Sequence, residues 1–456
     1  MHIAKRIHSH IRRALIRRGM TAPLIQRLKR EIVGTLGPAD APYTLLALNA
    51  HRFRQDLSIL AERFGFRILK LSKPGQSLIP NLYWPEHFHP TSAYFRPAPG
   101  SPLAETQGRV RAALGAVLPG FLRAVGADAV LSAAVYYLND WDYAAACAAR
   151  GIPYLVLYRE CFVADAREQD IQRATFQEIG PFPGSHVIVH NQTMRRLMLE
   201  TGFLPPDRVS APGCMRMDPF VERIRATPPL PPDAPKVLTL FSFVHCIGIL
   251  ETCNSWAPDR DAGFVELFDH THAQVARLAK EHPDITVNIK IKWTADEEWI
   301  QHIHIALAKY GLDAADIPNL HILWDEDAQD LIMASQVVVG FGSTTLAEAA
   351  VAGKRVIIPC FAEALDPKNA DNVLLRDDFD CFDVAHAPDD VTRLALEGFA
   401  HPQVPEPVMA RRRDIFERYV SSLSADAGAQ YAATIRRVID EARGGRDGKV
   451  RDGEPD

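Results

Sequence analysis

Short apolar runs alternate with amphipathic segments along most of this chain, and the alternation predicts repeated strand–helix units. The apolar runs are continuous and rich in β-branched residues, which is typical of parallel strands covered on both faces. This order favours a parallel sheet with right-handed crossovers. In the first half, strands are expected at 43–49, 66–71, 129–138, 153–158 and 186–190, and helices at 55–64, 109–125, 140–150 and 192–201.

A proline-rich segment at 227–235, TPPLPPDAP, interrupts this pattern and marks the expected domain boundary. Such a segment forms neither a helix nor a central strand, so it is expected to be a stiff spacer. The alternation then restarts, with strands at 236–243, 285–291, 320–323, 336–341 and 355–359 and helices at 265–281, 297–310 and 328–334.

The predicted fold class is therefore α/β, with two Rossmann-like, doubly wound parallel-sheet domains facing a central cleft. The first domain is expected at 40–226 and the second at 236–400. Basic amphipathic helices at 1–32, further helices at 406–443 and a disordered tail at 444–456 complete the predicted organisation.

The composition of the 456 residues is that of a soluble globular protein, with 47% hydrophobic and 23% charged residues. The net charge of −5 gives no overall electrostatic case for nucleic acid. No apolar run approaches the roughly 18–20 residues of a membrane span, and no secretory signal is recognisable. Seven scattered cysteines fit reduced thiols in a cytoplasmic protein. His270 and His272 are two residues apart, as are His302 and His304, so no metal site is expected.

The first thirty residues contain nine Lys or Arg and no acid. Ile3, Ile7, Ile11 and Leu15 recur at helical spacing, and a second short helix is expected to carry Leu24, Leu28 and Ile32. One interpretation is a basic helix that lies on the anionic inner face of the cytoplasmic membrane. The others are a peripheral helix packed on the first domain, and an organelle transit peptide.

The segment 336–359, QVVVGFGSTTLAEAAVAGKRVIIP, carries the strongest chemical signal. A buried strand leads into a turn at Gly342, Ser343 and Thr344, and a short helix follows. Glycine allows close backbone approach, and the free N–H groups of the helix start suit a phosphate. Glu348, one turn later, is placed to reach a sugar hydroxyl. The alternative is a capping box formed by Thr345 and Glu348, which needs no ligand.

Together with NLHILWDEDAQDLIMAS and with VSAPGCMRMDPF at 209–220, this segment resembles the GT-B class of glycosyltransferases, in particular bacterial enzymes of capsule and lipopolysaccharide biosynthesis. Within 209–220, Gly213, Arg216 and Asp218 match a G-x-x-R-x-D pattern that closes the first domain in such enzymes. The resemblance covers roughly residues 125–365. It implies a nucleotide-sugar donor, bound without a D-x-D metal site and without a further cofactor.

The resemblance implies roles for residues of the second domain. The turn at Gly342, Ser343 and Thr344 would meet the phosphates, Glu348 the ribose, and Trp324 with Asp325 the base. Two further sets are left open. Lys290 and Lys292 are either phosphate-binding cations or a solvated strand end, and His245 either touches a phosphate or is a structural histidine.

On the acceptor side, an inverting transfer needs a general base at the carboxyl end of a first-domain strand. Glu160, Asp140 and His51 meet that condition. Glu160 is preferred, because burial after an apolar strand would raise its pKa. Asp140 has the alternative role of capping the next helix. The remaining residues expected to line the cleft are Arg159, which could hold an anionic group, His190, Asn191 and Arg216.

The favoured function is a membrane-associated glycosyltransferase that moves a sugar from a nucleotide-sugar donor to a surface-glycan or lipid-linked acceptor. Two enzymes related in fold are alternatives: a UDP-N-acetylglucosamine 2-epimerase-like enzyme and a CDP-glycerol glycerophosphotransferase-like enzyme. The S-G-G turn typical of the first and the D-Y-S-S turn of the second are absent here. A catalytically silent scaffold of a polysaccharide assembly complex is the alternative from a different class.

Overall fold

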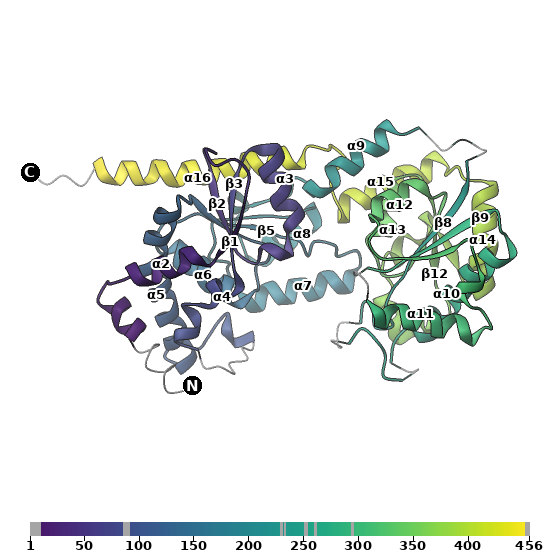
Figure 1. Cartoon of the computed structure of the whole chain (residues 1–456), viewed down its shortest axis with the longest axis horizontal. Coiled ribbons are helices and arrows are strands. Elements are labelled where there is room, and N and C mark those ends of the chain that lie inside the picture. Colours follow the sequence, from purple (N-terminus) through teal and green to yellow (C-terminus); the bar gives the residue numbers. More distant parts are fainter. Residues whose placement is uncertain are drawn as a thin grey trace, which may run out of the picture. The chain divides into compact units, whose positions relative to one another are not determined.

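The computed structural model describes residues 11–84, 92–228, 231, 234–249, 254–259, 262–292 and 296–451 (Figure 1). Ile3 and Ile7 of the predicted basic helix, and the last five residues of the predicted tail, lie outside these ranges. The chain divides into two compact units. Unit 1 comprises Met1–Cys161, Gln169–Pro219 and Ser424–Asp456, and unit 2 comprises Phe162–Glu168 and Phe220–Leu423.

Unit 1 is built on a seven-stranded sheet in the order β1-β3-β2-β4-β5-β6-β7. All neighbours are parallel except β1, which runs antiparallel to β3 at the edge. The strand order reverses between β2 and β4, which makes their carboxyl ends the topological switch point. The strands are β1 Ile32–Leu36, β2 Thr44–Ala47, β3 Arg67–Leu71, β4 Ala129–Ser132, β5 Tyr154–Leu157, β6 His186–Ile188 and β7 Val209–Ser210.

Helices cover this sheet. The described helices of the first half of the chain include α2 Ala22–Arg30, α3 Arg54–Phe64, α4 Lys73–Ser77, α5 Pro102–Val125, α6 Leu138–Ala148, α7 Ala166–Ile179, α8 Gln192–Glu200 and α9 Asp218–Ala226. α2 packs on α5, and its Leu24 and Leu28 are buried. A Cβ on Gly120 of α5 would lie 2.7 Å from Cδ1 of Ile25. Of the alternatives for the basic region, packing on the first domain thus describes α2, although Ile32 belongs to β1.

The long helix α16 (Ala427–Arg451), yellow in Figure 1, also belongs to unit 1. Tyr431 and Ile435 lie in the same core cluster as Leu45 and Phe66. The Asp218 carboxylate accepts hydrogen bonds from the first two backbone N–H groups of α16, at 3.2 and 2.7 Å. The helix continues to Arg451, past the expected start of a disordered tail at 444.

Unit 2 contains a fully parallel six-stranded sheet in the order β10-β9-β8-β11-β12-β13. This is the Rossmann order, with its switch point between β8 and β11. The predicted fold class of two doubly wound domains is therefore confirmed. The strands are β8 Lys236–Phe241, β9 Ile285–Lys290, β10 Leu320–Leu323, β11 Val337–Gly340, β12 Arg355–Pro359 and β13 Asp383–Ala385. The helices of this half include α10 Val265–Glu281, α11 Glu297–Lys309, α12 Ala328–Ala334, α13 Thr345–Val351, α14 Pro388–Ala400 and α15 Glu406–Tyr419.

No helix within the described ranges is both long enough and apolar enough to cross a membrane.

Candidate functional site

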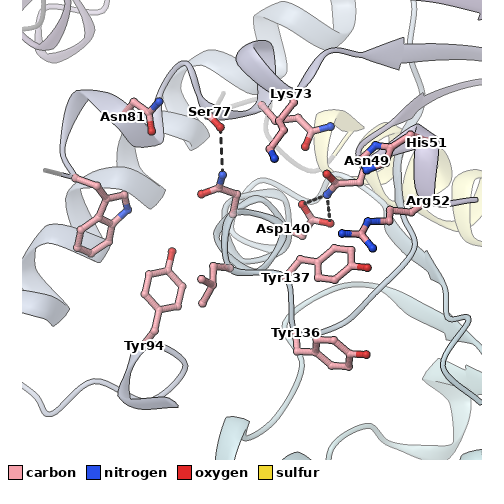
Figure 2. A pocket seen from close by; sticks show the side chains of 14 residues that line it. Asn49, His51, Arg52, Lys73, Ser77, Asn81, Tyr94, Tyr136, Tyr137 and Asp140 are labelled. Atoms are coloured by element: carbon pink, nitrogen blue, oxygen red, sulfur yellow. Dashed lines mark hydrogen bonds between the residues drawn. The ribbon is translucent and has the colours of Figure 1, made fainter. Parts of the chain in front are cut away.

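A pocket of about 470 Å³ opens at the carboxyl ends of β2, β3 and β4 in unit 1 (Figure 2). The loop after β2 contributes Asn49 and His51, the segment after β4 contributes Asp140, and Lys73 begins the helix after β3. Ligands of doubly wound sheets bind outside the carboxyl ends, at the switch point. This position makes the pocket the first candidate site. Its remaining lining residues are Arg52, Gln76, Ser77, Asn81, Trp84, Tyr94, Tyr136, Tyr137, Leu138 and Asn139.

Asp140 is the buried acid of this pocket, with 2% of its surface exposed. The amide of Asn49 donates to both carboxylate oxygens at 3.0 Å, and the Ser132 hydroxyl donates to one of them. Burial outweighs these bonds and raises the pKa of Asp140 to about 6. The alternative role as a helix cap is wrong, because Tyr137 holds the N-cap position of α6 and makes no side-chain cap bond.

Three basic side chains, His51, Arg52 and Lys73, stand around the same part of the pocket. His51 and Arg52 belong to the 3-10 helix Ala50–Arg52, and all three side chains are exposed. The Arg52 guanidinium lies 5.6 Å from the centre of the Tyr137 ring. Partial burial and the charges of Arg52 and Lys73 lower the pKa of His51. Among the described residues, neither Arg52 nor Lys73 forms an ion pair.

Aromatic side chains form another part of the lining. The Tyr94 hydroxyl donates to the Asp142 carboxylate, which also accepts a 2.8 Å bond from Arg111 Nε. Trp84 packs on Tyr94 with 5.7 Å between ring centres, and Gln107 Nε2 donates to the Tyr94 carbonyl at 2.8 Å. These contacts fix the Tyr94 ring, so this wall is preorganised.

Glu160, the preferred base, is exposed at the end of β5. The burial on which that prediction depended is absent, so its physical reason was wrong. Its neighbour Arg159 faces Asp56 of α3, with Nε 3.7 Å from Oδ2. Arg216 approaches the other oxygen of Asp56 at 3.3 Å. Asp56 therefore holds both guanidinium groups at one place in unit 1.

His190 and Asn191, at the end of β6, are both buried. Asn191 caps α8, because its side-chain oxygen accepts from Met194 N–H at 2.9 Å, while its amide donates to the Cys161 carbonyl at 2.9 Å. Burial, together with Arg216 and Arg159, holds the pKa of His190 well below its usual range. Asn191 is thus committed to the fold, and His190 is a neutral imidazole beside the two arginines.

In unit 2, a turn follows β11 as predicted, and the surrounding structure requires a glycine in it. Gly342 has φ +63°, and a Cβ there would lie 2.6 Å from Cγ1 of Ile247. Its bare backbone makes room for Ile247 in the loop after β8. Ser343 Oγ bonds to Thr345 Oγ1 at 2.8 Å. The alternative capping box is wrong, because Thr344 is the N-cap of α13 and Thr345 lies inside the helix. Glu348 is buried in α13.

The cations expected near the donor have different positions. Lys290 is buried, and its Nζ donates to the carbonyls of Ile291 at 2.5 Å and Trp324 at 2.9 Å. Desolvation lowers the pKa of Lys290. The interpretation of Lys290 as a solvated strand end is therefore wrong, and its ammonium group ties β9 to the end of β10. Lys292 is exposed. The Trp324 side chain is 40% exposed, directly after β10.

His245 follows β8 and is buried among aromatic rings. The ring centres of Trp256, Phe268 and His302 lie 4.8, 4.9 and 5.0 Å from its own. Burial and His302 lower the pKa of His245 to about 4, so the ring is neutral at pH 7. Within the described residues, neither ring nitrogen has a hydrogen-bond partner. Its burial agrees with the structural interpretation more than with a phosphate ligand.

The structure thus brings two of the three candidate bases, Asp140 and His51, into one pocket and leaves Glu160 outside its lining. Sequence analysis missed most of the other lining residues. Asn49 and Arg52 stand in LLALNAHR beside His51, and Tyr136 and Tyr137 stand in VYYLND before Asp140. Polar and aromatic residues that directly follow a buried strand were the available signal.

In the part of the chain that the structure describes, no three histidine, cysteine, aspartate or glutamate side chains gather in a way that suits a metal ion.

No protein-family model matches the sequence, and no curated protein is significantly similar to it. Solved structures resemble the chain in fold. The UDP-GlcNAc 2-epimerase of Neisseria meningitidis, bound to UDP-GlcNAc, is 13% identical over 87% of this chain and 99% of its own, with a TM-score of 0.48. HepE of Anabaena, in complex with UDP and glucose, is 13% identical over 86% and 99%, with a TM-score of 0.42. The wall teichoic acid polymerase TagF is 13% identical over 96% and 98%, with a TM-score of 0.46. These likenesses concern the fold alone.

Proposed function

We propose that this protein is a glycosyltransferase that takes a sugar from a nucleotide-sugar donor and attaches it to an acceptor bound in the unit 1 pocket. The observation that carries the proposal is Asp140. It is a buried carboxyl group, its pKa is raised to about 6, and it lines a pocket at a topological switch point. Such a group is ionised at neutral pH and still basic enough to take a proton, which is the property of an efficient general base.

In the proposed reaction, an acceptor hydroxyl attacks the anomeric carbon of the donor sugar. Asp140 takes the hydroxyl proton as the new C–O bond forms. The bond between the anomeric carbon and the phosphate oxygen breaks, and its electron pair leaves with the nucleotide. Asn49 and Ser132 hold the carboxylate in one orientation throughout. His51, a neutral base in the same pocket, is the second candidate for the proton acceptor.

We place the donor at the carboxyl edge of the unit 2 sheet. Trp324 offers an exposed indole face there, which suits stacking by a nucleotide base. The turn at Ser343 and Thr344 follows β11, beside the switch point of this sheet. Glu348 remains the proposed ribose contact, and Lys292 a proposed phosphate contact. No resident metal or cofactor enters the proposal.

The acceptor we propose is a surface glycan or a lipid-linked saccharide. Exposed Ile11 and Met20, together with Arg17 and Arg18, support contact between this part of the chain and an anionic membrane surface. A lipid-linked acceptor would lie at the same surface. Binding of the full chain to vesicles with and without anionic lipid tests this part, and equal binding to both would contradict it.

A thermal-shift screen against UDP, GDP, CDP, CMP and their sugars tests donor binding. A ligand at about a hundred times its dissociation constant stabilises the folded state by roughly 2.7 kcal/mol. One nucleotide class should shift the wild type and shift Trp324→Ala much less. Ile305→Ala is the matched control, because Ile305 is 43% exposed in unit 2 and lies on α11.

Turnover is then tested with the nucleotide sugar that binds. Asp140→Asn should retain the nucleotide-induced shift and lose transfer to added acceptor by a hundredfold or more. Interconversion of the free nucleotide sugar without any acceptor would instead indicate an epimerase. No shift with any nucleotide would contradict the proposed transferase and the epimerase alternative alike.

A further inference from the structure

The charge of the unit 1 pocket points to one class of ligand. We infer that this pocket binds an anionic saccharide, meaning a sugar that carries a phosphate or carboxylate group. The inference rests on the proposed function and names the chemical class of its acceptor.

Two permanent cations reach the pocket from different elements. Arg52 comes from the segment after β2, and Lys73 is the first residue of α4, after β3. Both are exposed, and among the described residues neither has an ion-pair partner. Figure 2 shows them around the Asn49–Asp140 pair. A concave site with two cations that no described carboxylate pairs with attracts an anion and can hold it by charge-assisted hydrogen bonds.

Among the described lining residues, the one acid, Asp140, does not neutralise these cations. Asp140 is buried, and its oxygens accept from the neutral groups of Asn49 and Ser132. Within the described residues it forms no ion pair with Arg52 or Lys73, so it leaves their charges available to a ligand. A cationic ligand or a metal ion would meet Arg52 and Lys73 first, and both would repel it.

The rest of the lining suits the sugar. Trp84, Tyr136 and Tyr137 supply partly exposed aromatic surface. Asn81 and Asn139 supply amide groups that can donate to and accept from ring hydroxyls. A volume of about 470 Å³ lies in the range of small-molecule sites, so it fits a small saccharide or the end of a longer glycan. An inorganic anion alone would leave these groups unused.

The inference is tested by calorimetric titration of the full chain without nucleotide, using glucose, glucose 6-phosphate, glucuronic acid and inorganic phosphate. At least one anionic sugar should bind tenfold or more tightly than glucose and than phosphate. The pair of glucose 6-phosphate and glucuronic acid distinguishes a phosphate site from a carboxylate site. The inference would be overturned if glucose, or inorganic phosphate, bound as tightly as the tighter of the two anionic sugars.

Variants locate the site. Arg52→Ala and Lys73→Ala should each weaken binding of the anionic sugar about tenfold, whereas Arg52→Lys should restore most of it. Arg54→Ala is the matched control: Arg54 is close enough to lower the pKa of His51 but does not line the pocket, so its loss should change binding less than threefold. An equal loss in Arg54→Ala would show a diffuse charge effect and overturn the inference.

The nucleotide screen separates this inference from the proposed function. A nucleotide shift that Trp324→Ala abolishes, with no preference for anionic sugars, keeps the transferase and overturns the anionic acceptor. An anionic preference that depends on Arg52, with no nucleotide shift, keeps the saccharide site and contradicts the transferase.

Discussion

Asn49 donates its side-chain amide to both carboxylate oxygens of Asp140, across 3.0 Å in each case. This contact joins the loop after β2 to the first turn of α6, after β4, so it bridges the two strands of the switch point. Asn49 reaches Asp140 from a left-handed backbone conformation, with φ 50°. Asparagine tolerates that region better than most residues, so one residue type satisfies both demands.

Replacement of Asn49 should therefore impair turnover through two separable effects. Asn49→Ala removes the amide and strains the backbone, whereas Asn49→Gly removes the amide and keeps the left-handed conformation. The Asn49 hydrogen bond lowers the pKa of Asp140, so both variants should move the acidic limb of the pH–rate profile upward. Turnover should fall about tenfold or more in both. A fully active Asn49→Gly would contradict the role of the amide.

Asp140 should also make the free energy of unfolding depend on pH. Its pKa rises on folding from 3.8 to about 6, so the folded state binds its proton more tightly than the unfolded state. This contribution is fully present below about pH 4 and is lost as pH rises through about 6. As pH rises across that window, the unfolding free energy of the wild type should fall by about 3 kcal/mol relative to that of Asp140→Asn. Thermal or denaturant unfolding at a series of pH values measures it, and a flat difference would show that Asp140 has an ordinary pKa.

Substitution of Asp56 should lower the free energy of unfolding more than substitution of an exposed residue of the same helix, α3. Its buried carboxylate faces both Arg159 and Arg216, so Asp56→Asn leaves two guanidinium groups close together without the charge between them. We expect a loss of about 2–3 kcal/mol, less than for a fully buried pair because the arginines are partly exposed. Glu62→Gln, on the exposed side of the same helix, should cost less than about 0.5 kcal/mol. Equal denaturation midpoints for the two variants would refute this role.

Replacement of Gly342 by alanine should lower the free energy of unfolding more than the same replacement of Gly353, which also has a positive φ. Gly342→Ala and Gly353→Ala both place alanine at positive φ, +63° and +74°, which costs about 1–2 kcal/mol in either case. Only Gly342 also meets Ile247, at 2.6 Å, while the nearest neighbour of Gly353 is Met409 Cε at 4.0 Å. The excess cost, about 1–3 kcal/mol, should largely disappear in an Ile247→Ala background. Lack of coupling in this double-mutant cycle would remove the steric explanation.

The sheets were predictable because buried parallel strands are continuous apolar runs, and helices between them have their own period. The edge strand β1 could not be predicted in this way. Val33 is 68% exposed there, and a solvent-facing antiparallel edge lacks the apolar run that marks a buried strand. The bounds of β4 were also extended too far, since the expected strand 129–138 ends at Ser132 and a loop and α6 follow.

The pocket was predictable only in part. Asp140 and His51 were recognised because each follows a strand, but Arg52 and Lys73 look like ordinary loop residues until β2 is known to lie between β3 and β4. Glu160 was preferred for the same local reason as Asp140, and the sequence does not say which residues after a strand turn inward. Lys290 and Gly342 were named as donor-binding candidates from their residue types and positions. In the structure, the contacts they make lie inside unit 2: Lys290 with the Trp324 carbonyl, and Gly342 with Ile247.

The position of α16 affects how this protein is made. Tyr431 and Ile435 belong to the same core cluster as Leu45 and Phe66, although nearly four hundred residues separate the first strand of that cluster from the helix. A ribosome makes the sheet of unit 1 before unit 2, and it makes α16, one of the helices that cover this sheet, only after unit 2 is complete. Domains generally fold as units during synthesis. Unit 2 should therefore reach its native state first, while the nascent first unit keeps the apolar surface beneath α16 exposed and remains a substrate for chaperones until α16 has emerged.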